Sequence, residues 1–540
     1  MLRLTNLSVP LDYTEDSLKL ILLKKLRLSA DQLLSFHISR RSIDARSKQD
    51  VHFVLSVDLK LRDEQSVLRR SKNLSQVRNP DKSDEHAALF NIHSSSCRPP
   101  AVPPLVVGAG PAGLFAALTL ARAGMNPVLI DRGRSVDART KDVSALQESG
   151  ILIPDSNVQF GEGGAGAFSD GKLTCGVKSP HIRYILETFV ANGAPEEILI
   201  DQKPHIGTDR LKGVVASIRN EIIRLGGTVL FETRLEELIL RGGHVEGAVL
   251  CHDGERREFL TDTVLLCIGH SARDTVQALF GQGLRMEQKP FAMGVRIEHP
   301  RVLIDRSQYG AFAGHPALGA ASYKLICHTP DGRGVYTFCM CPGGEVIAAA
   351  SQPGGVVTNG MSLHARNGAN SNSALLVGVK PEDFGDDHPL AGFVLQRSIE
   401  KAAFKAGGGG FIAPAQRVGD FLENRASRAF GEILPSYRPG TVPADLRAFL
   451  PVWMIEDLKK GIRAMNAQLA GFADPDAVLT GPETRSSSPV RILRNALGEA
   501  DDIRGLYPVG EGAGYAGGIV SAAADGISAA LKAIEKQRLL

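Results

Sequence analysis

From residue 105 the chain reads Leu105-Val-Val-Gly-Ala-Gly-Pro-Ala-Gly-Leu-Phe-Ala-Ala-Leu-Thr-Leu-Ala-Arg-Ala-Gly124, and Pro127-Val-Leu-Ile-Asp131 follows. This pattern predicts a buried strand, a glycine turn, an apolar helix and a second strand. Gly108, Gly110 and Gly113 stand where a dinucleotide-binding turn needs glycine: for the tight turn, for approach of a pyrophosphate and for helix–strand packing. Asp131 ends the second strand, where a carboxylate can meet ribose hydroxyls. The sequence therefore predicts an α/β dinucleotide-binding domain with the pyrophosphate at the helix start.

Composition and charge argue against several classes of protein. The 540 residues include 62 Lys and Arg against 59 Asp and Glu, a net charge of +3, which gives no general electrostatic footprint for nucleic acid. Seven cysteines are scattered without CxxC pairs, which indicates a reducing compartment and no structural metal. We find no signal-peptide pattern and no apolar run long enough for a transmembrane segment. We expect a cytoplasmic protein of two or three domains.

Residues 1–70 predict a small separate α/β domain. Strand and helix patterns follow one another in an order that favours a ferredoxin-like split unit. Its first helix, over Ser17–Leu28, is basic and could contact an acidic protein partner or a membrane, although its apolar stripe is more simply the core of the domain. Residues 71–104 are polar and end in a stretch with four prolines, which predicts a linker.

A second glycine-rich stretch, Asn157–Leu173, holds five glycines between anchoring aromatic and aliphatic residues. Such a segment lets backbone lie flat against a ligand and present its N–H groups. Ser169 and Asp170 can bond hydroxyls, and Lys172 can balance a negative charge. Further on, His205 is a plausible acid or base, although a lone histidine is more often structural.

The rest of the chain predicts an inserted domain and a return to the first. Residues 228–269 alternate in short strands that end at Gly269, and residues 275–480 predict a mainly antiparallel sheet that roofs a site. Within it, Cys339-x-Cys341 is either a redox pair or two small core residues. After residue 481 a strand, a glycine turn from Gly510 and a helix follow, with too few residues left for a second dinucleotide domain. We therefore expect this helix start to serve the other end of the same ligand.

Several motifs together resemble the uncharacterised bacterial FAD-dependent dehydrogenases, a family of NAD(P)/FAD-dependent oxidoreductases with a glutathione-reductase-like FAD-binding fold. The resemblance runs from about residue 100 to the end and is carried by Phe160-Gly-Glu-Gly-Gly-Ala-Gly, Pro204-His-Ile-Gly-Thr-Asp209, Phe338-Cys-Met-Cys-Pro-Gly-Gly344, Thr358-Asn-Gly-Met361, Glu483-Thr-Arg485 and Gly510-Glu-Gly-Ala-Gly-Tyr-Ala-Gly-Gly518. It implies an α/β fold with an FAD-binding Rossmann domain at 105–274 and 481–540, an inserted α+β substrate domain at 275–480, and the small N-terminal domain.

The resemblance also implies extended FAD and a hydride exchange between flavin N5 and a small-molecule substrate, with NAD(P)H as a candidate transient donor. Glu511 stands where many relatives carry Asp. The expected cofactor-binding residues are Gly108, Gly110, Pro111, Ala112, Gly113, Asp131, Arg132, Gly163, Gly164, Ser169, Asp170, Gly171, Lys172, Leu235, Gly269, Gly510, Glu511, Gly517, Gly518 and Ile519.

The catalytic candidates are Lys172, His205, Arg366 and Arg485, which could polarise or protonate a substrate. Three other functions stay open: a flavin monooxygenase or hydroxylase, a flavin-binding regulatory protein that docks through residues 1–70, and a protein with NAD as its cofactor. The sequence names neither the substrate nor the oligomeric state.

Overall fold

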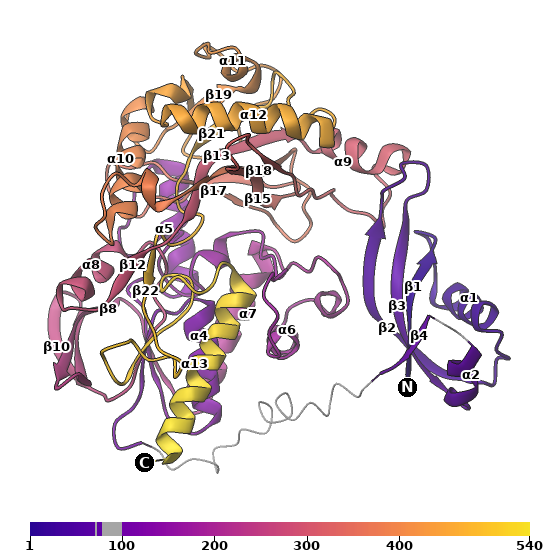
Figure 1. Ribbon diagram of the computed structural model, residues 1–540, viewed down its shortest axis with the longest axis horizontal. Helices are drawn as coiled ribbons and strands as arrows, with labels where there is room; N and C mark the ends of the chain where they lie inside the picture. The colour runs from indigo at the N-terminus through magenta and orange to yellow at the C-terminus, as the bar shows by residue number, and fades with distance from the viewer. Residues whose placement is uncertain (71–72, 78–99, 540) are drawn as a thin grey trace.

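The computed structural model describes residues 1–70, 73–77 and 100–539 (Figure 1). Most of the expected linker, residues 71–72 and 78–99 with Cys97, lies outside the described residues. The described chain is a mixed α/β fold in which an N-terminal sheet, a parallel sheet and a large antiparallel sheet each carry their own helices.

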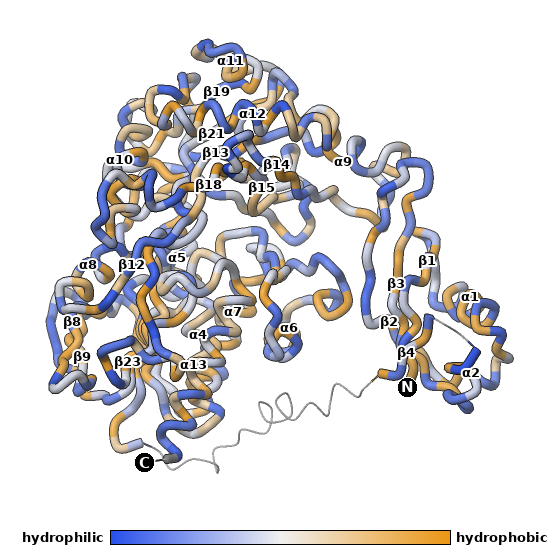
Figure 2. Tube along the Cα trace, in the orientation of Figure 1, coloured by the Kyte–Doolittle hydropathy of each residue, from blue (hydrophilic) through white to orange (hydrophobic). Residues whose placement is uncertain are grey.

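The N-terminal part is a four-stranded antiparallel sheet of order β2-β3-β1-β4 with two helices. Its elements follow the β-α-β-β-α-β order of the split unit: β1 (Leu2–Val9), α1 (Glu15–Leu26), β2 (Leu33–Asp44), β3 (His52–Leu61), α2 (Glu64–Arg70) and β4 (Leu74–Gln76). The apolar stripe of α1, Leu18, Leu22 and Leu26, is buried, so it forms the core of this part. Strand β2 lies at the sheet edge and is largely hydrophilic in Figure 2, which suits an edge strand.

The domain boundary expected at residue 70 is too early. Strand β4 pairs with β1 through Leu74, Ser75 and Gln76, so this part extends at least to Gln76. A strand of three residues is too short to give the alternating pattern on which a sequence-based boundary depends.

The central part is a five-stranded parallel sheet of order β23-β11-β5-β6-β7. Apart from the edge strand β7, its strands are short runs of fully buried residues, as expected for a parallel sheet covered on both faces. Its strands are β5 (Leu105–Val107), β6 (Val128–Ile130), β7 (Thr228–Leu230), β11 (Val264–Leu266) and β23 (Leu506–Pro508). Its helices are α4 (Pro111–Arg122), α5 (Val136–Ser149), α6 (Ile182–Ala191), α7 (Thr208–Arg224) and α13 (Ile519–Leu539).

The two ends of this part meet in space. Strand β23 pairs with β11, and α13, yellow in Figure 1, lies against α4. A three-stranded antiparallel sheet and a short helix complete this part: β8 (Thr233–Arg241), β9 (His244–His252), β10 (Glu255–Leu260) and α8 (Arg273–Gly281). The pair β12 (Met286–Gln288) and β22 (Val490–Ile492) marks where the chain leaves for the third part and returns from it.

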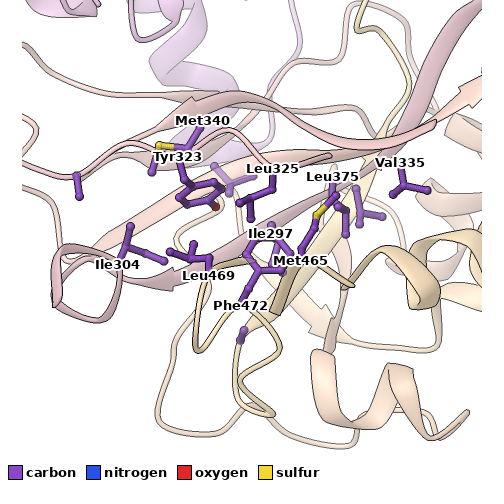
Figure 3. Packing of buried hydrophobic residues seen from close by; sticks show 14 of the residues in the cluster. Ile297, Ile304, Tyr323, Leu325, Val335, Met340, Leu375, Met465, Leu469 and Phe472 are labelled. Carbon is purple, nitrogen blue, oxygen red and sulfur yellow. The ribbon is translucent and has the colours of Figure 1, made fainter. Parts of the chain in front are cut away.

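The third part is a seven-stranded, mainly antiparallel sheet of order β14-β15-β18-β13-β21-β19-β20. One face packs through Ile297, Leu375 and Val335 against Met465 of α12 and Phe472 (Figure 3). The strands are β13 (Phe291–Pro300), β14 (Ile326–His328), β15 (Gly334–Cys341), β18 (Asn370–Val379), β19 (Ala413–Arg417), β20 (Thr441–Pro443) and β21 (Val478–Glu483), beside the pair β16 (Glu345–Ala348) and β17 (Thr358–Met361). The helices are α9 (Arg301–Tyr309), α10 (Ala391–Ala406), α11 (Val418–Leu422) and α12 (Val452–Gln468).

This sheet does not keep the bounds 275–480. It runs from Phe291 to Glu483, because α8 packs on β8 of the central part and β21 crosses residue 480. The sequence of β21 contains Gly481-Pro482, a pair that is typical of turns and so hides the strand.

Candidate functional site

A cavity of about 690 Å³ lies between the parallel sheet and the seven-stranded sheet. Its walls come from the loop after β5, the starts of α4 and α13, the glycine-rich segment 157–173, and strands β15 and β17. The volume is within the range of roughly 300–1,000 Å³ that small-molecule and cofactor sites occupy. We therefore treat this cavity as the candidate active site.

The glycine loop after β5 needs its glycines for distinct reasons. Gly108 has φ +105°, and a Cβ there would lie 2.6 Å from the carbonyl oxygen of Cys267. A Cβ at Gly113 would lie 1.8 Å from the carbonyl oxygen of Gly108, so this residue packs the helix on the turn. Gly110 instead has only the Cα of Gly164 within 4 Å of an added Cβ, at 3.8 Å, and it lines the cavity. The loop leaves room for a phosphate where a side chain would otherwise stand.

Asp131 braces this loop. Its two carboxylate oxygens accept hydrogen bonds from the backbone N–H groups of Ala109 and Gly133, each at 2.8 Å. The side chain lines the cavity, and each oxygen keeps a lone pair for a ribose hydroxyl. Next to it, Arg132 donates to both carboxylate oxygens of Asp274, at 3.0 and 2.9 Å, and lies over the ring of Phe160.

The glycine-rich segment 157–173 is held in place by a buried arginine that sequence reasoning missed. Arg139 of α5 donates hydrogen bonds to five backbone carbonyl oxygens, those of Asn157, Val158, Gly161, Glu162 and Gly164. Burial lowers the pKa of its guanidinium to about 10, so it stays charged at neutral pH. The segment is therefore an anchored wall, with the N–H of Gly163 donating to Ala109 across the glycine loop at 2.8 Å.

The start of α13 forms the opposite wall. Gly517, Gly518 and Ile519 line the cavity there, where backbone N–H groups of a helix start favour negative charge. Glu511 lines it as well, and its Oε1 lies 3.5 Å from Nδ1 of His270. The other ring nitrogen of His270, Nε2, is buried without a hydrogen-bond partner among the described residues. Nothing in the sequence pointed to His270 as a site residue except its place directly after Gly269.

A charged cluster lies where the glycine-rich segment meets the antiparallel sheet. Asp170 is fully buried and accepts hydrogen bonds from Arg366 and from the hydroxyl of Ser362, and Lys172 Nζ lies 3.6 Å from its Oδ2. Burial alone would raise the pKa of Asp170, but Lys172 and Arg366 hold it below its ordinary value. Lys172 Nζ has no hydrogen-bond partner among the described residues, and both cations line the cavity.

His205 lies beside this cluster, because its backbone pairs with that of Lys172. It is absent from the described residues that line the cavity, its Nε2 lies 3.1 Å from the backbone oxygen of His364, and its ring stacks on that of His364. Burial, with the charge of Arg366, lowers the pKa of His205 to about 4. The ring is therefore neutral at pH 7 and packs on that of His364, and a catalytic role for His205 stays a prediction.

Arg485 lines the cavity, yet its donors are occupied. It donates to both oxygens of Glu400, each at 3.0 Å, and Arg273 donates to the same two oxygens at 2.7 and 3.0 Å. Its Nη1 also donates to Ser271 and Ser351. Burial works against the charge of Glu400, but the two arginines hold its pKa well below the ordinary value. This ion network joins α8 of the central part to α10 of the third part.

Two further residues of the seven-stranded sheet contribute to the site. Glu483, at the end of β21, lines the cavity, and both its oxygens accept from Arg296, at 3.3 and 3.1 Å. Burial raises the pKa of Glu483 to about 7, although the buried Arg296 opposes the shift. Glu483 belongs to a motif noted in the sequence, but nothing there showed that it would face the cavity.

The expected cofactor residues divide into two groups. Gly113, Gly163, Gly171 and Gly510 lie behind the cavity surface. The lining includes the others, namely Gly108, Gly110, Pro111, Ala112, Asp131, Arg132, Gly164, Ser169, Asp170, Lys172, Leu235, Gly269, Glu511, Gly517, Gly518 and Ile519. The glycine loop, the starts of α4 and α13, and Asp131 therefore line one continuous space. Its lining has the groups that an extended dinucleotide needs.

Comparison with known proteins identifies the domains. Residues 290–486 match a family described as "FAD-dependent protein, C-terminal domain-like", and residues 101–144 match an "FAD binding domain". Residues 1–60 match a domain of unknown function. Among the described residues, no helix is long and apolar enough to cross a membrane, and no group of three metal-binding side chains occurs.

An uncharacterized protein of Clostridium beijerinckii is 46% identical to this chain over 536 residues, 99% of each chain. Solved structures with a similar arrangement include the glycerol-3-phosphate dehydrogenase of Bacillus halodurans complexed with FAD, at 11% identity, a TM-score of 0.36, and coverage of 84% of this chain and 67% of that one. A flavoprotein/dehydrogenase of Cytophaga hutchinsonii has 11% identity, a TM-score of 0.36, and coverage of 81% and 79%. The chain belongs to the family of the Clostridium protein, a family of FAD-binding proteins with a mixed α/β flavoprotein oxidoreductase fold.

Proposed function

We propose that this protein is an FAD-dependent dehydrogenase or reductase that exchanges hydride between flavin N5 and a small-molecule substrate. The observation that carries the proposal is the continuity of the cavity: one space joins the glycine loop at Gly110 to the charged residues under the seven-stranded sheet. In this proposal the cofactor lies extended, as in the glutathione-reductase-like subclass. The central part holds FAD, and the sheet of residues 291–483 covers the substrate.

Each wall of the cavity has a role toward the cofactor. Bound FAD would supply the two-electron chemistry, while the protein supplies orientation and electrostatics. The N–H groups of the glycine loop would bind the pyrophosphate, and Asp131 and Arg132 lie where the adenosine ribose would be. The start of α13, at Gly517 and Gly518, would stabilise negative charge on the flavin, by about 0.3–1 kcal/mol for an exposed site and more where it is partly buried.

The substrate would lie among Lys172, Arg366 and Glu483. Among these three side chains, Lys172 is the one whose charged group, Nζ, makes no hydrogen bond to the described residues. It would orient a polar or anionic substrate. Glu483 has a pKa raised to about 7, so it can hold or release a proton at neutral pH. We assign positioning roles to Arg485 and His205, because the hydrogen bonds of both are made within the protein.

The test is an anaerobic reduction screen. The purified protein is expected to be yellow and to release FAD on denaturation, identified by chromatography. Bleaching of the flavin absorbance by NADH, NADPH or a metabolite then identifies the donor and substrate. Release of FMN, or no flavin, overturns the proposal, and oxygen uptake coupled to a hydroxylated product would replace it with a monooxygenase. A flavin that no donor reduces would favour a regulatory protein docking through its N-terminal domain.

A further inference from the structure

The two cysteines of Cys339-x-Cys341 lie together at the cavity, where strand β15 is distorted. The pairing of β15 with β18 shifts between Phe338 and Cys341, and Cys339 has φ +39°, a conformation uncommon for a residue with a side chain. In a regular strand, residues two apart are separated by about 6.6 Å between Cα atoms, close to the upper limit of about 6.8 Å for a disulfide. The bulge changes this geometry at the pair.

The two cysteines contact each other. The Cys341 thiol donates a hydrogen bond to the Cys339 carbonyl oxygen at 3.3 Å. Cys339 lines the cavity, whereas Cys341 is fully buried behind it. One sulfur is therefore open to whatever fills the cavity, and the second is placed to pair with the first.

The groups around the two thiols shift their pKa values in opposite directions. Arg296 Nη2 donates to the Cys339 carbonyl oxygen at 3.0 Å and lies 3.7 Å from Cys341 Sγ, and Lys172 is the second nearby cation. The neighbouring Cys341 side chain lowers the pKa of Cys339 despite its burial, with Lys172 and Arg296 adding to the effect and Asp170 opposing it. The Cys339 side chain and burial raise the pKa of Cys341. This arrangement, a thiolate beside a thiol, is typical of reactive cysteine pairs.

The other cysteines near the core differ from this pair. Burial raises the pKa of both Cys267 and Cys327, which makes them inert small residues. A pair of structural core cysteines would need neither the strained backbone of Cys339 nor its opening to the cavity.

We propose that Cys339 and Cys341 form a reversible dithiol–disulfide couple that exchanges two electrons with FAD bound in the same cavity. In the oxidising direction the Cys339 thiolate and the Cys341 thiol join in an S–S bond. Two electrons and the Cys341 proton pass to oxidised FAD, which becomes the singly protonated, anionic reduced flavin. The reverse transfer breaks the S–S bond and restores the thiolate and the thiol. The inference rests on the proposed FAD site.

The first test follows the thiols of the full-length protein directly. The protein is equilibrated without oxygen in glutathione buffers of increasing oxidation, free thiols are alkylated, and peptides are identified by mass spectrometry. We expect a Cys339–Cys341 disulfide that appears and disappears with the buffer, with and without FAD. Cys339 should also be alkylated at pH 7 about tenfold or more faster than Cys327. Cys175 also lines the cavity and is the competing partner. Absence of the Cys339–Cys341 disulfide, or a disulfide that pairs Cys339 with Cys175, overturns the proposal.

The second test follows the flavin. The wild-type protein, Cys339→Ser, Cys341→Ser and the matched control Cys327→Ser are reduced at the flavin without oxygen, freed of excess reductant and mixed with oxidised glutathione. We expect reoxidation of the flavin in the wild type and the control to be at least about tenfold faster than in the two pair variants. Equal rates in all four proteins overturn the couple but leave the proposed function standing. A wild-type protein without FAD overturns the proposed function, while the glutathione titration still reports on the thiols.

Discussion

Gly526 of α13 packs directly on the carbonyl oxygen of Ala112 in α4: a Cβ at Gly526 would lie 2.1 Å from that oxygen. Both helices start at the cavity, and Ala112 itself lines it. This contact therefore fixes the distance between the two helix starts that would bind opposite ends of the cofactor.

Gly526→Ala should separate the two helices and lower the FAD content, because the backbone oxygen of Ala112 cannot move away as a flexible side chain would. We expect a destabilisation of about 1–3 kcal/mol, the range for overpacking, seen in urea unfolding. Gly213→Ala in α7 is the matched control, because nothing lies within 4 Å of its added Cβ. It should be neutral or slightly stabilising. Equal behaviour of the two variants would show that the helices tolerate separation.

Gly110→Val should reduce FAD binding and leave the fold intact. A Cβ at Gly110 approaches protein only at the Cα of Gly164, 3.8 Å away, so the extra methyl groups would extend into the cavity. Cofactor content should fall stepwise from wild type to Gly110→Ala to Gly110→Val, while thermal unfolding of the FAD-free proteins stays the same. Full flavin occupancy in the valine variant would place the pyrophosphate elsewhere.

Glu400→Gln should strongly destabilise the protein, because Arg273 and Arg485 would keep their buried charges without the carboxylate between them. Breaking a buried ion pair costs about 3–5 kcal/mol. The measurement is urea unfolding at pH 7, with the exposed Glu258→Gln as a control expected within about 0.5 kcal/mol of wild type. A small effect of Glu400→Gln would mean that water reaches the network.

Glu483 should make stability depend on pH. Its pKa is about 7 in the folded protein and about 4.3 unfolded, so folding takes up a proton between these values. The free energy of unfolding should therefore fall as pH rises from about 4.3 to 7, by about 3–4 kcal/mol, and then level off. Comparing urea unfolding of wild type and Glu483→Gln at pH 5 and pH 8 tests this. The variant should lack that share of the slope, and identical pH profiles would contradict the raised pKa.

His205 should stay neutral through the physiological range, because burial and Arg366 lower its pKa to about 4. The NMR ring signal of His205 is assigned as the one missing from the spectrum of His205→Gln. In the wild-type protein this signal should not shift between pH 5.5 and 8. The variant should also keep its flavin reduction rate within about twofold, since the ring does not line the cavity. A titration near pH 6.5, or a large loss of rate, would return His205 to the list of catalytic residues.

The sequence allowed much of the cofactor side to be predicted, because its signals are local. A short apolar strand, three glycines and a terminal acid at Asp131 must occur in that order for backbone to meet a pyrophosphate. The charged residues under the seven-stranded sheet were less predictable, because they come together only in the folded chain. Arg485 has the right chemistry, but Glu400, far away in sequence, occupies its donors. Arg139 and His270 gave no pattern that could have separated them from surface residues.

The start of α13 is the last wall of the cavity to be translated, directly after strand β23 of the parallel sheet. The glycine loop, the parallel strands β5 to β11 and the whole seven-stranded sheet are synthesised before them. Until residues 506–522 leave the ribosome, β11 pairs with β5 on one side and has an open edge on the other, and α4 lacks the helix that packs on Ala112. Domains generally fold in the order of their synthesis. The central part cannot do so, because the seven-stranded sheet is inserted between its two segments of sequence. The cavity is therefore completed late in biosynthesis, only after the whole seven-stranded sheet has been made.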